Sequence, residues 1–188
     1  MSAVFTPTRH KLSVDDYHKL GEAGILDEDS RVELIEGELI DMAPIGVSHM
    51  TVVNRLNRLL VQAVGDLGVV SVQNPVSFPP HSEPQPDVTV LRAGMDRVEA
   101  GLPGPADVLL LIEVSDTTVA YDRGTKLRLY ARVGVAEYWL VNLQSGSVEV
   151  YRGATSHGYL QTMEVRPGDI VRPLSLPAVE IEVASIFG

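Results

Sequence analysis

One carboxylate stands inside a segment that predicts a buried strand. Residues 108–112 are all apolar, Glu113 follows them, and Val114 is apolar again. Because side chains alternate between the two faces of a strand, Glu113 shares a face with Leu111 and Ser115. A buried, unpaired carboxylate costs several kcal/mol. We therefore expect Glu113 to meet a lysine or arginine, a metal ion, or solvent at a strand end.

A second carboxylate, Asp87, follows Pro86 at the start of a short predicted strand, residues 87–92. Acids at the ends of neighbouring strands can share one hard divalent ion through oxygen ligands. Such an ion polarises a phosphoryl oxygen and activates a bound water. Asp87 alone is equally typical of a turn beside proline. The hypothesis of a metal site therefore depends on the pair.

Lys126 is a basic residue that could form the third element of a site with Asp87 and Glu113. Within a helix predicted over 119–133, Lys126, Leu129 and Tyr130 fall at i, i+3 and i+4, along the edge facing the sheet. Pointing inward, its ammonium could orient a nucleophilic water or stabilise phosphate charge. A second, overlapping apolar stripe leaves the other possibility open, in which Lys126 only borders this face and extends to solvent.

His49 and Glu33 are two further candidates. His49 lies near the start of a helix predicted over 48–64, where Ser48 would be the cap. A single histidine on an apolar face is more often a core or capping residue, although at a helix start it could contact phosphate or water. Glu33 lies on the first strand of a hairpin predicted over 31–42.

Composition limits the classes of protein that need considering. The 188 residues fit one domain, and the net charge of −10, from 15 basic and 25 acidic residues, argues against strong sequence-independent DNA binding. There is no cysteine, so any metal would be held by oxygen or histidine nitrogen. The chain has neither a membrane-length apolar run nor the pattern of a signal peptide, and we expect a cytoplasmic protein.

The remaining pattern predicts a mixed α/β sheet with helices on its faces. A helix over 13–24 is capped by Ser13, and the hairpin turns at Glu36-Gly37. The centre of the chain then alternates helix, three strands, helix and strand, over 48–64, 68–78, 87–92, 107–116, 119–133 and 136–142. Further strands are predicted over 148–152, 159–165 and 178–183.

These residues and their order resemble the PD-(D/E)XK nuclease superfamily, and more closely the Uma-two (Uma2) family of restriction endonuclease-like proteins, found mainly in bacteria. The motifs that carry the resemblance are VELIEGELIDMAP, the histidine before the long helix, QPDVTVL, LLIEVSDTT, YDRGTKLRLYARVGVAEYWLVN and VEVYR. The resemblance spans nearly the whole chain. It implies a single restriction-endonuclease-like domain over residues 1–188, with additional β-hairpins at both ends.

The resemblance also implies roles for the candidate residues. Asp87 and Glu113 would bind Mg²⁺ or Mn²⁺, with the carbonyl of Val114 as a third ligand. Ser115 stands where the superfamily motif has its lysine, and Lys126 would replace that lysine from the helix. Glu33 and His49 would assist. In this interpretation the metal ion, rather than a buried base, offsets the charge of Glu113.

The function implied is metal-dependent endonucleolytic hydrolysis of phosphodiester bonds in DNA, by a homodimer able to cut both strands. An alternative is a catalytically silent protein of this fold that binds nucleic acid or a protein partner in a mobile-element or defence system. The acidic charge favours that alternative. Hydrolysis of another phosphate ester, or a protein with no working site, also fits the residues.

Overall fold

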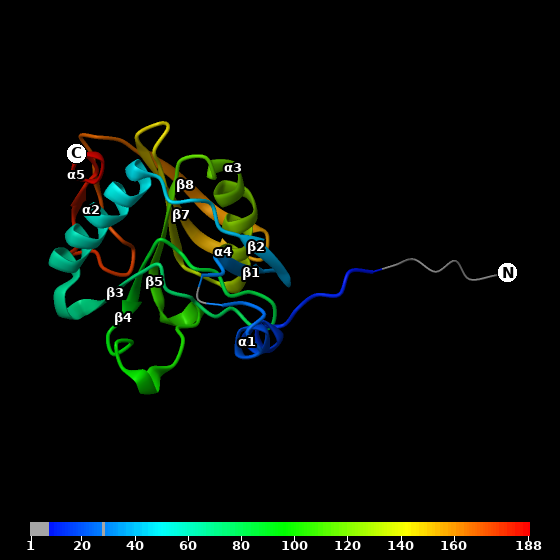
Figure 1. Ribbon diagram of the computed structural model, residues 1–188. Helices are drawn as coiled ribbons and strands as arrows, with labels where there is room; N and C mark the ends of the chain where they lie inside the picture. The colour runs from blue at the N-terminus through cyan, green and yellow to red at the C-terminus, as the bar shows by residue number, and fades with distance from the viewer. Residues whose placement is uncertain (1–7, 28) are drawn as a thin grey trace. The chain divides into compact units, whose positions relative to one another are not determined.

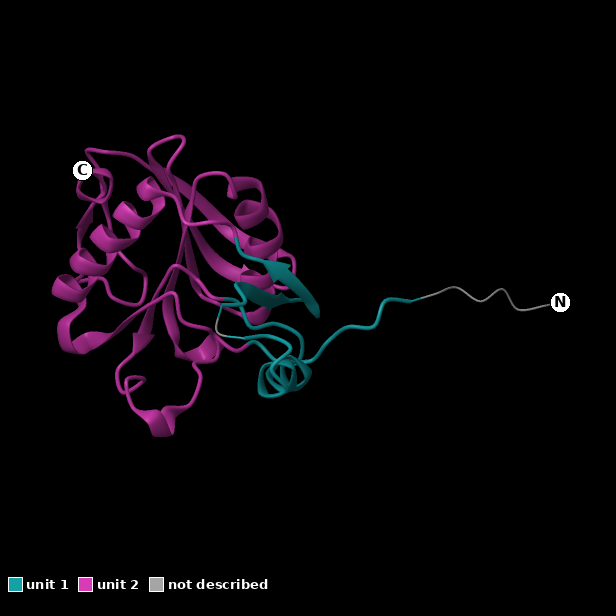
Figure 2. Ribbon diagram, viewed as in Figure 1, with its two compact units in different colours: residues 1–42, 78–84 teal, residues 43–77, 85–188 magenta. Residues whose placement is uncertain are grey.

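The computed structural model describes residues 8–27 and 29–188 (Figure 1). The chain packs as two compact units (Figure 2). Unit 1 contains the residues up to 42 together with residues 78–84, and unit 2 contains residues 43–77 and 85–188. The single domain expected over 1–188 stays a prediction.

Unit 1 combines a short helix with the predicted hairpin. Helix α1, Val14–Glu22, begins after Ser13, whose hydroxyl caps it as predicted. Strands β1, Val32–Ile35, and β2, Glu38–Asp41, pair antiparallel. The turn at Glu36 and Gly37 is confirmed, and both residues take positive φ, 53° and 85°. Residues 78–84 join this unit through an isolated bridge between Leu34 and Glu83.

Unit 2 is built on one mixed sheet of six strands in the order β3-β4-β5-β6-β7-β8. Only β5 and β6 are parallel to each other, and every other neighbouring pair is antiparallel. The predicted mixed α/β architecture is therefore confirmed. The strands are β3 Gly68–Val72, β4 Val88–Arg92, β5 Val108–Ser115, β6 Glu137–Asn142, β7 Ser147–Thr155 and β8 Gly158–Val165.

Helices cover both faces of this sheet (Figure 1). Helix α2, Val47–Val64, lies on one face, where its buried residues pack with Leu110, Ile112 and Val114 of β5. The opposite face carries one interrupted helix that consists of α3, Val119–Tyr121, a π-helical turn, Asp122–Lys126, and α4, Leu127–Val133. Alternation along β5 turns Glu113 toward this second helix.

Three predicted details differ from the structure. Helix α2 agrees with the helix predicted over about 48–64, but its N-cap residue is Gly46, so Ser48 is not its cap. The strand predicted over 68–78 ends at Val72, because Gln73 takes a φ of 51° that interrupts the extended backbone. The strand predicted over 178–183 is reduced to β10, Ile181–Glu182, because helix α5, Val183–Phe187, follows at once.

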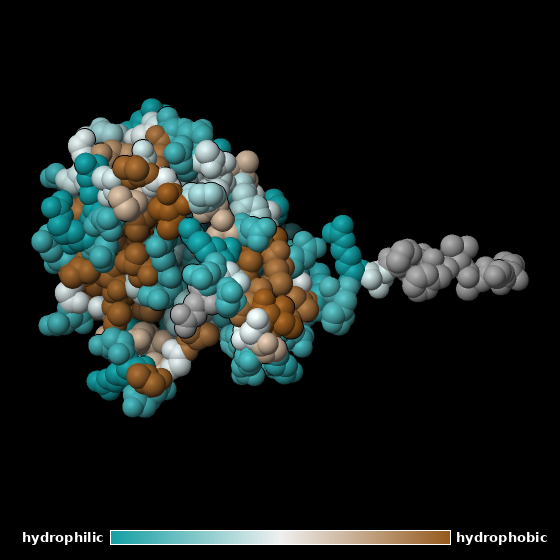
Figure 3. All heavy atoms as spheres, viewed as in Figure 1, coloured by the Kyte–Doolittle hydropathy of each residue, from teal (hydrophilic) through white to brown (hydrophobic). Residues whose placement is uncertain are grey.

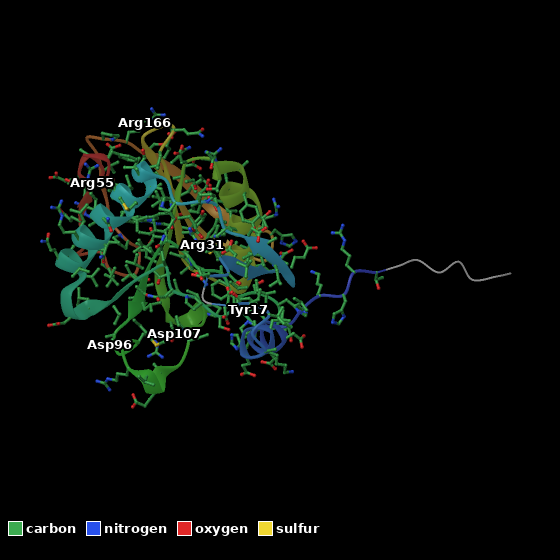
Figure 4. The ribbon with its side chains drawn as sticks, viewed as in Figure 1. Tyr17, Arg31, Arg55, Asp96, Asp107 and Arg166 are labelled. Atoms are coloured by element: carbon green, nitrogen blue, oxygen red, sulfur yellow. The ribbon has the colours of Figure 1, made fainter. Side chains whose placement is uncertain are left out.

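The carboxy-terminal segment packs beside α2. Strand β9, Ile170–Val171, pairs with β10. Arg55, labelled in Figure 4, lies on α2, and its guanidinium donates to the carbonyl of Phe187. Apolar side chains gather beside α2 on the face shown in Figure 3. Among the described residues, no helix combines the length and apolar character needed to cross a membrane. Short 3₁₀ turns occupy Gly65–Leu67, Val98–Ala100 and Pro105–Asp107.

Candidate active site

The two predicted carboxylates meet where β4 begins and β5 ends. Asp87 precedes β4, and its Oδ2 accepts a hydrogen bond of 2.9 Å from the backbone N–H of Val114. The backbone N–H of Asp87 in turn points to Oε2 of Glu113, 3.4 Å away. Antiparallel pairing of Val88 with Ile112 aligns the two strands and produces this approach. The predicted proximity of Asp87 and Glu113 is therefore present in the structure.

The carbonyl of Val114 points toward the same edge of β5 as Asp87. The N–H and C=O of one strand residue face the same edge, and successive residues face opposite edges. The N–H of Val114 donates to Asp87, whereas the carbonyl of Ser115 accepts from Leu143 on the β6 side. The backbone oxygen of Val114 thus lies on the β4 side of β5, where the Asp87 carboxylate is also found.

Lys126 reaches Glu113 from the second helix. Its Nζ lies 3.0 Å from Oε1 of Glu113, and the two side chains are 8% and 5% exposed. The same oxygen accepts a hydrogen bond of 2.6 Å from the hydroxyl of Tyr130, a fully buried residue. Lys126 therefore points inward. The expectation that no buried base offsets Glu113 is wrong, because Lys126 does so, while the role of Glu113 as a metal ligand stays a prediction.

His49 approaches Asp87 from the other face of the sheet. Its Nε2 lies 3.0 Å from Oδ2 of Asp87, and the two side chains are 17% and 14% exposed. The position of His49 in the first turn of α2 brings its ring to the sheet edge at which Asp87 lies. Asp87 and His49 form the more accessible end of the site, while Glu113 and Lys126 form the buried end.

Gln73 is a further neighbour of Asp87. Its backbone N–H donates to the Asp87 carbonyl at 3.1 Å, and its side-chain amide lies 3.4 Å from Oδ1. The left-handed backbone of Gln73, at φ 51°, allows both groups to turn toward Asp87 where β3 ends. Backbone conformations of this kind in residues other than glycine gather at functional sites.

Burial and negative charge also affect the tyrosines beneath the site. Tyr138 of β6 is fully buried and stacks edge-on against Tyr130, with ring centroids 5.2 Å apart. Burial raises the pKa of Tyr138 well above its usual value, and the charges of Glu113 and Asp122 raise it further. Tyr138 therefore stays a neutral hydroxyl at any physiological pH.

Glu33 belongs to unit 1, whereas the other predicted site residues belong to unit 2. It lies on β1 opposite Ile40 of β2, on the hairpin strand where it was expected. The assisting role that the family resemblance implies for Glu33 stays a prediction.

The oxygen atoms at this edge suit a hard divalent ion held by few protein ligands. Within residues 8–27 and 29–188, no group of three or more histidine, cysteine, aspartate or glutamate side chains could hold a metal. An ion here would depend on the two carboxylates, the Val114 carbonyl, and oxygens from water or substrate. Mg²⁺ is commonly bound in this way, by one or two carboxylates with water and substrate phosphate completing its shell. The residues present therefore fit Mg²⁺.

Sequence reasoning assigned no role to Tyr130, Gln73 or Asp122. Tyr130 follows Lys126 by four residues, a spacing that could have indicated a shared target on the sheet. Its aromatic ring, however, fits an apolar stripe equally well. Gln73 lay inside a predicted strand, and nothing in the local pattern indicated its positive φ.

The buried pair of Glu113 and Lys126 is expected to be strongly coupled. Glu113→Gln or Lys126→Met removes one charge of a buried ion pair, and breaking such a pair should cost about 3–5 kcal/mol of unfolding free energy in each single variant. The double variant should lose clearly less than the sum of the single losses. Urea denaturation of the four proteins measures this difference.

The matched control is the exposed pair of Arg172 and Glu180, with side chains 49% and 53% exposed. Solvent screening should leave a coupling of only about 0–1 kcal/mol in the same four-protein cycle. Strictly additive losses for Glu113 and Lys126 would contradict the assignment of a buried ion pair.

Comparison with known proteins identifies the family and the fold. The model of the Uma2 family, described as putative restriction endonuclease, matches residues 14–184. A similar solved structure is the crystal structure of a putative nuclease belonging to DUF820 from Anabaena variabilis ATCC 29413, at 1.96 Å resolution. It has a TM-score of 0.72 and 18% sequence identity, covers 94% of this chain and 97% of its own, and shows a shared fold. No curated protein matches the chain. Since the family model spans most of its residues, the chain belongs to the Uma2 family, as its motifs predicted.

Proposed function

We propose that this protein is a nuclease that depends on Mg²⁺ or Mn²⁺ and hydrolyses phosphodiester bonds in DNA. One observation carries the proposal: Asp87, Glu113 and Lys126 converge where β4 begins and β5 ends, in a chain of the Uma2 family. Two acids and a base in this arrangement are suited to phosphoryl chemistry, in which positioning and charge stabilisation supply most of the catalysis.

Asp87 and Glu113 would hold the ion, with the carbonyl of Val114 as a third protein ligand. When bound, the ion polarises the scissile phosphate and lowers the pKa of a bound water. Oε1 of Glu113 accepts from Lys126 and Tyr130, whereas Oε2 lies near the Asp87 backbone. These two donors, one ammonium and one hydroxyl, therefore fix the rotation of the Glu113 carboxylate and keep its Oε2 on the side of Asp87.

Lys126 and His49 supply the remaining polar groups. The ammonium of Lys126 would orient the attacking water or stabilise negative charge on the phosphate, since its hydrogen bond holds it beside Glu113. His49 orients the Asp87 carboxylate through Nε2, and Val114 holds the same oxygen through its backbone N–H. Asp87 is thus constrained from two elements before any substrate arrives.

The overall charge favours one competing function. With 25 acidic and 15 basic residues, the protein lacks the basic excess that usually accompanies tight phosphate-backbone binding. A catalytically silent protein of this fold, either a metal-dependent nucleic-acid binder or a partner protein, would need no lysine poised for catalysis. The two functions differ in whether DNA is cleaved: salt-dependent DNA binding without strand scission in Mg²⁺ or Mn²⁺ would select the silent protein.

The first experiment is the melting midpoint of metal-stripped protein titrated with Mn²⁺ and Mg²⁺, which tests whether Asp87 and Glu113 bind a divalent ion. A ligand that binds only the folded state stabilises it by about 2.7 kcal/mol at a hundred times its Kd. The wild-type midpoint should rise with either ion, and Asp87→Asn and Glu113→Gln should not respond. Asp107→Asn is the matched control, because Asp107 pairs with Arg92 just before the start of β5 and should leave the response intact.

Nicking of supercoiled plasmid in Mn²⁺ then tests activity, and Lys126→Met should abolish it. A metal response without nicking of DNA would contradict DNA cleavage, and small phosphodiester substrates would test other phosphate esters. The absence of any metal response in the wild type would contradict the proposal as a whole.

The proposal includes a homodimer. Within the described residues, β3 and β8 form the two edges of the six-stranded sheet, and Leu160 and Met163 of β8 are exposed. Unpaired strand edges with exposed apolar side chains favour association. Light scattering during size-exclusion chromatography should give twice the chain mass of 20.4 kDa, and a single-chain mass would remove the dimer.

A further inference from the structure

The position that holds the lysine in the superfamily motif is occupied by a fully buried serine. Ser115 follows Glu113 by two residues on the same face of β5. Its hydroxyl donates a hydrogen bond of 2.7 Å to Oδ2 of Asp122. The strand therefore contacts the helix at this position through a neutral donor and a carboxylate.

Asp122 is itself buried, with 5% of its surface exposed. Besides Ser115, the hydroxyl of Thr118 donates to the same oxygen at 2.6 Å, and the hydroxyl of Tyr138 lies 3.4 Å from the Asp122 carbonyl. Contacts from β5, from the segment before the helix and from β6 thus converge on one residue. Such a carboxylate is fixed in place and is not available to solvent.

Asp122 is also the first residue of the π-helical turn, and Lys126 is the last. An α-helix advances by about 100° per residue. A π turn contains one residue more than an α turn, so the residues after it are rotated relative to an uninterrupted helix. Lys126, at the end of the turn, and Tyr130, one turn later, both reach Oε1 of Glu113. The extra residue therefore determines which side chains meet the sheet.

We propose that Asp122 is a positioning residue that anchors the π turn to Ser115 and thereby directs Lys126 onto Glu113. Ser115 occupies the motif position without a charge and instead donates a hydrogen bond to Asp122. The helix anchored in this way then places the ammonium of Lys126 beside Glu113. The importance of Asp122 for catalysis rests on the proposed function. The anchoring of Lys126 by Asp122 is independent of that function and can be measured without any substrate.

The lysine content of the protein makes this measurement specific. The chain contains three lysines, Lys11, Lys19 and Lys126, and only Lys126 is buried. Brief acetylation followed by peptide mass spectrometry gives a rate for each lysine. In the wild type, Lys126 should be modified far more slowly than Lys11 and Lys19, which serve as internal standards.

Asp122→Ala should raise the acetylation rate of Lys126 by about tenfold or more, the factor expected for local opening after loss of a hydrogen bond to a charged group. Lys11 and Lys19 should keep their rates. Asp122→Asn retains an acceptor oxygen and should restore most of the protection. If Asp122→Ala does not fold, the double variant Ser115→Ala/Thr118→Val removes the two donors and should give the same increase.

A matched variant separates positioning from general loss of stability. Leu176→Ala removes a core side chain of unit 2 away from the helix, so it should lower the melting midpoint while leaving Lys126 protected. Unchanged protection of Lys126 in Asp122→Ala would overturn the proposal, as would an equal increase in Leu176→Ala at the same melting midpoint.

Plasmid nicking distinguishes this result from failure of the proposed function. If the wild type does not nick DNA, the proposed function fails, while the acetylation rates still decide whether Asp122 positions Lys126. If it does, Asp122→Ala should lose nicking and Asp122→Asn should recover part of it.

Discussion

Burial of the Glu113 carboxylate is the constraint on which the rest of unit 2 depends. The central strand of a sheet covered by helices on both faces is a poor environment for a charge, and Glu113 is 5% exposed there. Two donors from the second helix, the ammonium of Lys126 and the hydroxyl of Tyr130, both bind Oε1 of Glu113 and stabilise its charge. The helix must therefore run across this face at a fixed rotation, which the π turn between Asp122 and Lys126 establishes. The opposite face is free to form an apolar core with α2.

Asp87 experiences a different environment at the same edge. Its Oδ2 accepts from the Val114 backbone N–H and lies 3.0 Å from Nε2 of His49. Its side chain remains 14% exposed. Lys126 offsets the charge of Glu113 alone. A divalent ion placed near Asp87 and Oε2 of Glu113 would thus offset the remaining negative charge of the two carboxylates. This asymmetry, with one acid neutralised by the protein and the other still accessible, is the electrostatic basis of the proposed metal dependence.

Much of this arrangement could be predicted from residue patterns, and the failures have physical causes. Alternation along β5 and the apolar stripe of α2 indicated which residues pack together, because burial follows these periodicities directly. The approach of Asp87 to Glu113 followed from two neighbouring strand ends. The direction of Lys126 stayed open, since a π turn shifts the helical phase without leaving a mark in the apolar pattern. The bridge between Leu34 and Glu83 joins distant segments, and no local rule indicates it.

The central claim is that Asp87 and Glu113 share one divalent ion, and anomalous diffraction from crystals grown with Mn²⁺ tests it most directly. The account predicts a single anomalous peak at about 2.0–2.2 Å from a carboxylate oxygen of each residue, the distance typical of small hard cations, with Lys126 still against Oε1 of Glu113. A peak elsewhere, or no peak while Lys126 and Tyr130 remain on Glu113, would contradict the claim and leave Glu113 as one half of a structural ion pair.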